Sequence, residues 1–178
     1  MARLPSRRLF LRSGIAMSAL PLYGCHCSLR DLKTIRMRDA VQELQRLASA
    51  VELESCTQWS WSKTLAHLAQ SIEYSMQGYP QTKSPLFQKW LGQPAYALFQ
   101  WRGWMHHDLT EPIPGSPAIA QDTQLQPALE RLMQASEAFM QWQGPLQPHF
   151  AYGTLTRSEY ETAHAMHMAD HFAAFKVA

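Results

Sequence analysis

Histidines at helical spacing are the residues of this sequence that could do chemistry. His167 and His171 stand four positions apart in a segment with helical periodicity, so their imidazoles face the same side, one turn apart. Two imidazoles at this spacing form the helical half of many transition-metal sites, and a third ligand must come from elsewhere. His67, on an earlier helical segment, is the natural third ligand. Three histidines would leave one coordination position open, as catalytic rather than structural metal sites do.

The spacing alone leaves other interpretations open. His164 stands three positions before His167 and seven before His171, so the spacing does not select two of the three. A histidine pair on one helix face is also often a packing or surface feature. Asp170 lies about 100° around the helix from His171, so we expect it to face a neighbouring helix.

Three histidines of the predicted folded domain lie outside this pattern. His106 and His107 follow the end of a predicted helix, where we expect imidazoles to cap the last carbonyl groups. His149 lies in a proline-rich loop and is a candidate for lining a pocket.

The elements that must position these residues are predicted to be helices. Apolar residues recur every three or four positions in five segments, and no segment alternates as a strand would. The fold class is therefore all-α: a four-helix core with one extra short or broken helix. The predicted helices cover residues 35–51, 60–78, 84–105, 122–144 and 156 to about 175.

Capping and helix-breaking residues set the limits of these helices. Gly78 ends the second predicted helix, and Asp122 is the expected N-cap of the fourth. Thr156 and Glu159 have the spacing of a capping box, which opens the last helix. Pro94 makes either a kink or a break in the third.

Length, composition and charge exclude several classes of protein. The chain has 178 residues, enough for one domain with a sizeable core, and its 46% hydrophobic fraction excludes a disordered chain. Four arginines precede Cys25, and the first acid of the chain is Asp31. Without the residues before Cys25, 12 basic and 14 acidic side chains remain, a formal charge of −2. The body of the protein therefore offers no basic patch, and we expect no nucleic-acid partner.

Residues 1–29 are predicted to be an export signal, and residues 30–178 the folded domain. The run Ser6-Arg7-Arg8-Leu9-Phe10-Leu11-Arg12 resembles the twin-arginine (Tat) consensus, with Arg12 in place of its lysine. An uncharged, moderately apolar stretch follows at residues 13–24, too short to span a bilayer. The predicted partner is the twin-arginine export machinery, and the predicted location is the periplasm or the outer face of the cytoplasmic membrane. The alternative is a frayed basic N-terminus on a cytoplasmic protein.

The cysteines bear on this prediction. Residues 22–25 (Leu-Tyr-Gly-Cys) resemble a lipobox, in which Cys25 is lipidated and becomes the new N-terminus. Tyr23 is bulkier than the usual residue there, so cleavage nearby without a lipid stays open. A lipid anchor at Cys25 is the one predicted attachment to a membrane. Cys27 and Cys56 could pair in an oxidising periplasm.

Two parts of the chain resemble a known family. Residues 61–75 read Trp-x3-Leu-x-His-Leu-Ala-Gln-Ser-Ile-Glu-Tyr-Ser, and the late run is His164-x2-His167-x3-His171. Both resemble DinB-like (DNA-damage-inducible-like) four-helix-bundle proteins, in a branch catalogued only as a domain of unknown function. The proline-rich loops 112–115 and 144–153 fit that branch too, and the resemblance runs from about residue 35 to 175.

The resemblance implies a ligand set. In the wider family, one histidine of the second helix and an i, i+4 pair of the last bind a divalent metal; by motif these are His67, His167 and His171. His164 would lie beside the site. If the protein is a metal-dependent enzyme, His164 or Tyr74 would shuttle protons. Three imidazoles suit zinc, nickel, iron or copper. Some relatives are thiol transferases or isomerases, and others have no established activity, so membership implies no single reaction.

Two hypotheses about function follow. The first is an exported metal-dependent hydrolase or thiol S-transferase acting on a small molecule that the sequence does not identify. The second is a non-catalytic metal-binding or structural envelope (lipo)protein. A homodimer is compatible with either.

Overall fold

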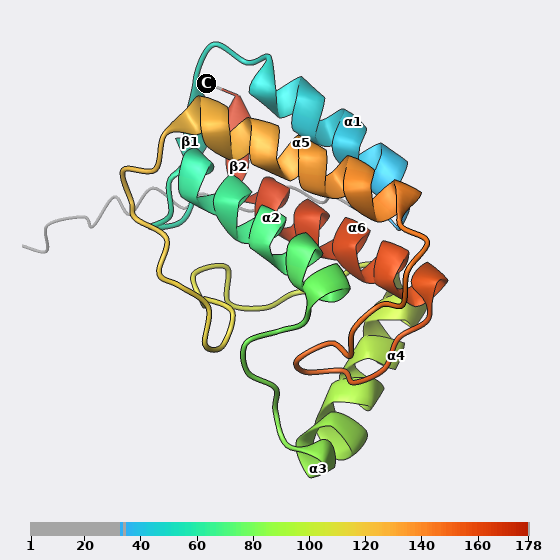
Figure 1. Cartoon of the computed structure of the whole chain (residues 1–178). Helices are drawn as coiled ribbons and strands as arrows, with labels where there is room; N and C mark the ends of the chain where they lie inside the picture. Colours follow the sequence, from blue (N-terminus) through green and yellow to red (C-terminus); the bar gives the residue numbers. More distant parts are fainter. Residues whose placement is uncertain (1–32, 34, 178) are drawn as a thin grey trace, which may run out of the picture.

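The computed structural model describes residue 33 and residues 35–177. The predicted export signal and the cysteine of its lipobox lie outside these residues. Over the described part the chain is mostly helical, with one short two-stranded sheet (Figure 1). None of the helices described is long and apolar enough to cross a membrane. The largely α-helical prediction is confirmed, and the prediction of no strand is wrong.

Four long helices make up the body of the molecule. Helix α1 packs against α5 and α6, and α2 packs against the same two helices (Figure 1). Each buries residues at helical spacing, such as Ala40 and Leu44 in α1 and Leu132 in α5, and these meet in one hydrophobic core. The bounds are α1 Met37–Ala48, α2 Trp61–Gln77, α5 Leu125–Gln141 and α6 Arg157–Ala173.

Side-chain caps begin two of these helices. Ser60 accepts a hydrogen bond from the backbone N–H of Lys63 and starts α2. At α6 the Thr156 hydroxyl accepts from the Glu159 N–H while the Glu159 carboxylate accepts from the Thr156 N–H, so the predicted capping box is confirmed.

The predicted cap of the fourth long helix is wrong. Asp122 lies in a turn before α5, and Gln124 holds the N-cap position without a side-chain hydrogen bond. Pro127 falls in the first turn of α5, where its missing N–H needs no partner. The helix therefore begins three residues after Asp122.

The two strands join the segment before α2 to the end of α6. Strand β1 (Leu53–Ser55) pairs antiparallel with β2 (Phe175–Val177). Each strand has three residues, too few to show alternation in the sequence. Helix α6 ends at Ala173 rather than near residue 175, because the following residues take up this pairing. The sheet holds together the ends of the two helices that carry the candidate ligands.

The remaining helical segment is an arm that projects from the body, residues 85–102 (Figure 1). It consists of α3 (Pro85–Phe87), a π-helical segment η1 (Gln88–Gly92) and α4 (Gln93–Arg102). The N–H of Gln93 bonds the carbonyl of Gln88, five residues back, and Pro94 follows at once with no N–H to donate. Of the two outcomes predicted at Pro94, a break is wrong, because the chain stays helical through a π turn.

Candidate metal centre

The structure brings the three predicted ligands together. His67, His167 and His171 each offer a nitrogen, and these atoms lie within 4.8 Å of one another. The Nε2 atoms of His167 and His171 are 3.1 Å apart, and the His67 ring centroid lies 5.3 Å and 4.9 Å from theirs. Three histidines at these separations could hold a metal ion.

Two neighbouring helices position these side chains. His67 lies in α2, and His167 and His171 occupy consecutive turns of α6. Because α2 and α6 pack against each other, the single imidazole of one faces the pair on the other. Trp59, only 7% exposed, has its ring 5.1 Å from that of His67 and 6.3 Å from that of His171, and so shields the cluster from water.

Burial keeps these imidazoles in the form that binds metals. Desolvation lowers the pKa of His67 to about 3, with a further lowering by His107. It also lowers the pKa of His167 and His171 well below the ordinary value. All three are therefore neutral at pH 7, and a neutral ring nitrogen is what a metal requires. Nδ1 of His67 is buried with no hydrogen-bond partner in the described part of the chain, so the donor set fits a metal ion.

A fourth histidine, not predicted as a site residue, lies against the cluster. The ring centroid of His107 is 5.0 Å from that of His167 and 5.1 Å from that of His171. Its Nδ1 is 2.7 Å from Oδ2 of Asp170, an ion-pair distance, although the atoms are not aligned for a hydrogen bond. The backbone N–H of His107 donates to the same carboxylate oxygen at 3.2 Å. Asp170 thus fixes the loop that carries His107.

Two expectations about this loop are wrong. Helix α4 ends at Arg102, and Gly103 caps it in the left-handed conformation, so the histidines that follow do not cap its carbonyls. Asp170 faces His106 and His107 on this loop instead of a neighbouring helix. No periodicity links the loop to α6, so the sequence carries no signal for this contact.

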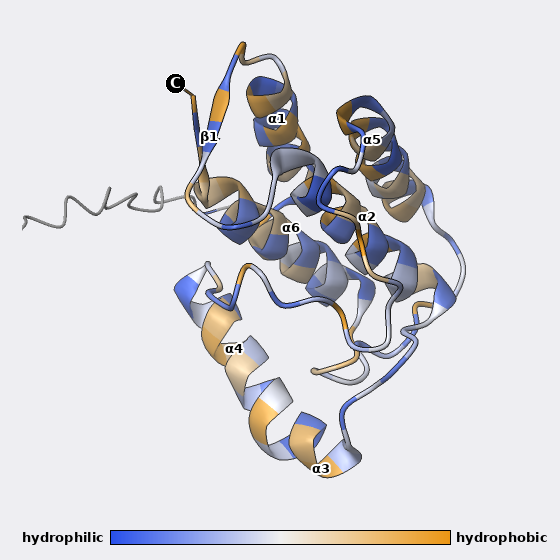
Figure 2. Cartoon of the chain, turned by 90° about the vertical axis from the view of Figure 1, so that its left-hand side faces the viewer, coloured by the Kyte–Doolittle hydropathy of each residue, from blue (hydrophilic) through white to orange (hydrophobic). Residues whose placement is uncertain are grey.

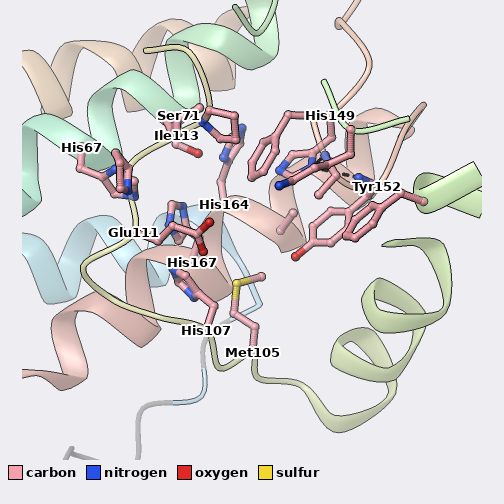
Figure 3. Close-up of a pocket in the computed structure, with 17 residues that line it drawn as sticks. His67, Ser71, Met105, His107, Glu111, Ile113, His149, Tyr152, His164 and His167 are labelled. Atoms are coloured by element: carbon pink, nitrogen blue, oxygen red, sulfur yellow. Dashed lines mark hydrogen bonds between the residues drawn. The ribbon is translucent and has the colours of Figure 1, made fainter. Parts of the chain in front are cut away.

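A pocket of about 390 Å³ opens beside the cluster (Figure 3). His67, His107 and His167 lie together on one side of it with Glu111, and His149 and Tyr152 lie on the other (Figure 3). The apolar part of its wall includes Met105, Ile113 and Phe150, and Lys83 adds a positive charge. The pocket could admit a small molecule that reaches a metal held by the histidines.

His164 lies in this pocket wall, as predicted beside the ligands. Its Nε2 is 3.0 Å from the Ser75 hydroxyl, whose proton goes to the Ile72 carbonyl at 2.6 Å. His164 must therefore donate from Nε2, which leaves the lone pair on Nδ1. Burial lowers the pKa of His164 to about 3, so it is neutral and a weak base at pH 7.

His149 lines the pocket, as expected of the proline-rich loop. Its Nδ1 accepts hydrogen bonds from the N–H groups of Ala151 and Tyr152 at 3.1 Å and 3.2 Å. The Tyr152 ring stacks on it at 4.3 Å. Burial lowers the pKa of His149 to about 3, so its proton sits on Nε2 and can be donated.

Tyr74 is not brought to the site. It is half-buried on α2, lies 5.8 Å from the ring of Tyr79, and is not among the residues that line the pocket. Its predicted role in proton transfer has no support from this placement.

Comparison with known proteins gives a family and no activity. The family model described as "Protein of unknown function (DUF1569)" matches residues 26–177. No curated protein and no solved structure matches the chain. The site itself is therefore the evidence for function.

Proposed function

The chain belongs to the family of proteins of unknown function DUF1569, and we propose that it is a metal-dependent enzyme acting on a small molecule. One observation carries this proposal: three histidine nitrogens within 4.8 Å of one another adjoin a pocket of about 390 Å³. A purely structural metal needs no such space beside it. The proposal includes a DinB-like four-helix bundle, supported by ligands on the second and the last of the four long helices.

The residues around the pocket have different proposed roles. A zinc, nickel or iron ion held by the three histidines would act as a Lewis acid on water or on a thiol, which fits a hydrolase or a thiol S-transferase. His107, fixed by Asp170 and 31% exposed, is the residue we assign to proton transfer. His164 accepts a hydrogen bond from the substrate through Nδ1, and His149 donates one through Nε2. These two orient the substrate and do not exchange protons, because their pKa values of about 3 are too low.

His107 also supports a second candidate function. Its ring is as close to His167 and His171 as they are to His67, so a small shift of its loop would make it a fourth ligand. Four imidazoles would complete a tetrahedral site and leave no position for substrate. The protein would then be a non-catalytic metal-binding envelope protein.

We also propose that the protein is exported by the twin-arginine route to the periplasm or the outer face of the cytoplasmic membrane. Cys56 is disulfide-bonded, and disulfides persist mainly in oxidising compartments. Its partner lies outside the described residues, where Cys25 and Cys27 are the other two cysteines of the chain. A lipidated Cys25 has no free thiol, so a lipid anchor there requires that Cys56 pair with Cys27.

The metal content of the purified protein tests the proposed enzyme. The chain is produced without a histidine tag, loaded separately with zinc, nickel and iron, dialysed and measured by elemental analysis. We expect about one equivalent of one metal in the parent, and none in the double variant His67→Ala, His167→Ala, because two of the three proposed ligands are removed.

His106→Ala is the matched control, because it removes an imidazole whose side chain is 63% exposed and lies outside the cluster. It should keep the metal. A parent that binds none of the three metals would refute the proposal. His107→Ala separates the two candidate functions. Unchanged metal affinity supports a site with three ligands and an open position, and a large loss of metal affinity supports a site closed by four histidines.

A further inference from the structure

A row of exposed apolar side chains follows the arm, and the metal centre does not account for it. Leu86, Trp90, Leu98 and Trp101 are 71%, 69%, 46% and 83% exposed. Figure 2 shows hydrophobic residues recurring along α3 and α4, away from the four long helices. We call these four residues the arm stripe. Two exposed tryptophans on one projecting element are far from the ordinary pattern of a soluble surface.

The π turn aligns the stripe along one side of the arm. In a regular α-helix, positions four apart drift by about 40° around the axis, so Leu86, Trp90 and Pro94 would spiral. The π segment Gln88–Gly92 turns less per residue and removes most of this drift. The π turn therefore keeps Leu86, Trp90 and Pro94 on one side of the arm.

The opposite side of the arm holds it to the body. The Gln88 side-chain amide donates to the Phe150 carbonyl at 3.3 Å, and the Tyr96 hydroxyl donates to the Glu159 carbonyl at 2.7 Å. Gly92 packs so closely on the loop that a Cβ there would lie 1.9 Å from the Ala151 oxygen. These contacts fix the orientation of the stripe, which faces away from the body.

The charged residues of the arm and of the segments that flank it in the sequence have one sign. Residues 74–107 contain Lys83, Lys89 and Arg102 and no aspartate or glutamate, in a chain with nearly equal numbers of basic and acidic side chains. The ammonium of Lys89 lies 5.6 Å from the ring of Trp90, within the stripe. An occupant of this face should combine an apolar layer with negative charge.

We propose that the arm is a membrane-binding element whose stripe lies in the interfacial region of an anionic lipid bilayer. Tryptophan and leucine on one side, with lysine and arginine nearby, is the composition of helices that lie in this region. A second copy of the chain fits less well, because two arms meeting face to face would bring like charges together. This contact is separate from a lipid at Cys25 and does not depend on the metal.

Vesicle binding by the full chain tests the proposal. Cys25→Ser removes any lipid, and the vesicles contain phosphatidylglycerol and phosphatidylcholine in equal parts, with bromine on the acyl chains. The arm variant carries Leu86→Ser, Trp90→Ser, Leu98→Ser and Trp101→Ser. The control carries Val51→Ser, Met133→Ser and Met140→Ser, which removes exposed apolar side chains elsewhere.

Bromine quenches only tryptophans that enter the bilayer, so binding through residues 1–29 cannot imitate the arm. We expect strong quenching in parent and control, loss of most quenching in the arm variant, and binding about tenfold weaker at high salt. Matching thermal melts of arm and control variants show that the fold is kept. Parent fluorescence that bromine does not quench would overturn the proposal. The proposal would also be overturned if the parent is a dimer and the arm substitutions convert it to monomers without changing the quenching.

Discussion

At the scale of single residues, the site depends on imidazoles that burial keeps neutral. A histidine in water has a pKa near 6.5, and a protonated ring cannot bind a metal. Here desolvation lowers the pKa of His67 to about 3, and those of His167 and His171 fall as well. The same burial lowers the stability of the fold in acid, because the unfolded chain takes up protons at these histidines more readily than the folded chain does.

We expect the metal-free protein to lose stability as the pH falls from about 6.5 toward 3. In this window the unfolded chain takes up protons at His67, His149 and His164, and the folded chain does not, because their pKa values are about 3. The loss between pH 7 and pH 5 should be about 2 kcal/mol for each of the three. Urea unfolding with a chelator present measures it.

The variant His164→Gln isolates one contribution, because glutamine can still donate to Ser75 but does not titrate. Its unfolding free energy should fall less steeply with decreasing pH than that of the parent. Equal slopes for parent and variant would contradict the assignment of a neutral, buried His164.

Spacing together with the family resemblance predicted the three candidate ligands, but not their whole environment. The i, i+4 pair and the motif around His67 place the ligands on two helices, and helix packing brings them together. His107 and Asp170 meet only because a loop after α4 folds back onto α6. Such a contact depends on the loop's path, which no periodicity encodes. Tyr74 shows the converse: it lies in the same motif as His67, yet its position on the helix keeps it out of the pocket.

At the scale of elements, local signals predicted most helices, and tertiary contacts determined the rest. The caps of α2 and α6 are local hydrogen bonds and could be predicted from a few residues. The two short strands exist only as a pair, so neither is visible alone. The π turn before Pro94 includes Gly92, which lies against the loop at Ala151, and no hydrophobic periodicity encodes this contact.

Gly92→Ala tests how the arm is held. In an isolated helix alanine is more favourable than glycine, and the φ of −64° here suits either residue. The added Cβ would nevertheless clash with the Ala151 carbonyl, so we expect destabilisation of about 1–3 kcal/mol. Urea unfolding measures this, and faster trypsin cleavage after Lys89 would locate the change in the arm.

Gln93→Ala is the control, since it changes an exposed neighbour on the same turn. Its unfolding free energy and its rate of trypsin cleavage should stay close to those of the parent. A stabilised Gly92→Ala protein would contradict the close packing of the arm on this loop.

At the scale of the whole molecule, the body, the pocket and the arm form a connected arrangement. The body supplies the histidines, and Lys83 and Phe87 line the pocket at the start of the arm. The disulfide at Cys56 is consistent with the proposed export from the cytoplasm. The exposed apolar residues of the arm are consistent with the proposed contact with a lipid surface. Each of these parts can be tested without the others.

Export can be tested in the full chain by the double variant Arg7→Lys, Arg8→Lys. The twin-arginine machinery requires the arginine pair, so we expect the variant to stay in the cytoplasm with Cys56 reduced. Cell fractionation and thiol labelling report the two effects. Arg3→Lys is the control outside the motif and should be exported; export of the double variant at the parent's level would refute the twin-arginine route.

The most direct test of the central claim is anomalous diffraction from crystals of the metal-loaded protein, recorded at the absorption edge of the metal found by elemental analysis. For zinc we expect a single peak about 2.0–2.1 Å from nitrogens of His67, His167 and His171, open toward the pocket, with His107 farther away. A peak bound by all four histidines would contradict an open catalytic site. No peak at the cluster would contradict the metal centre altogether.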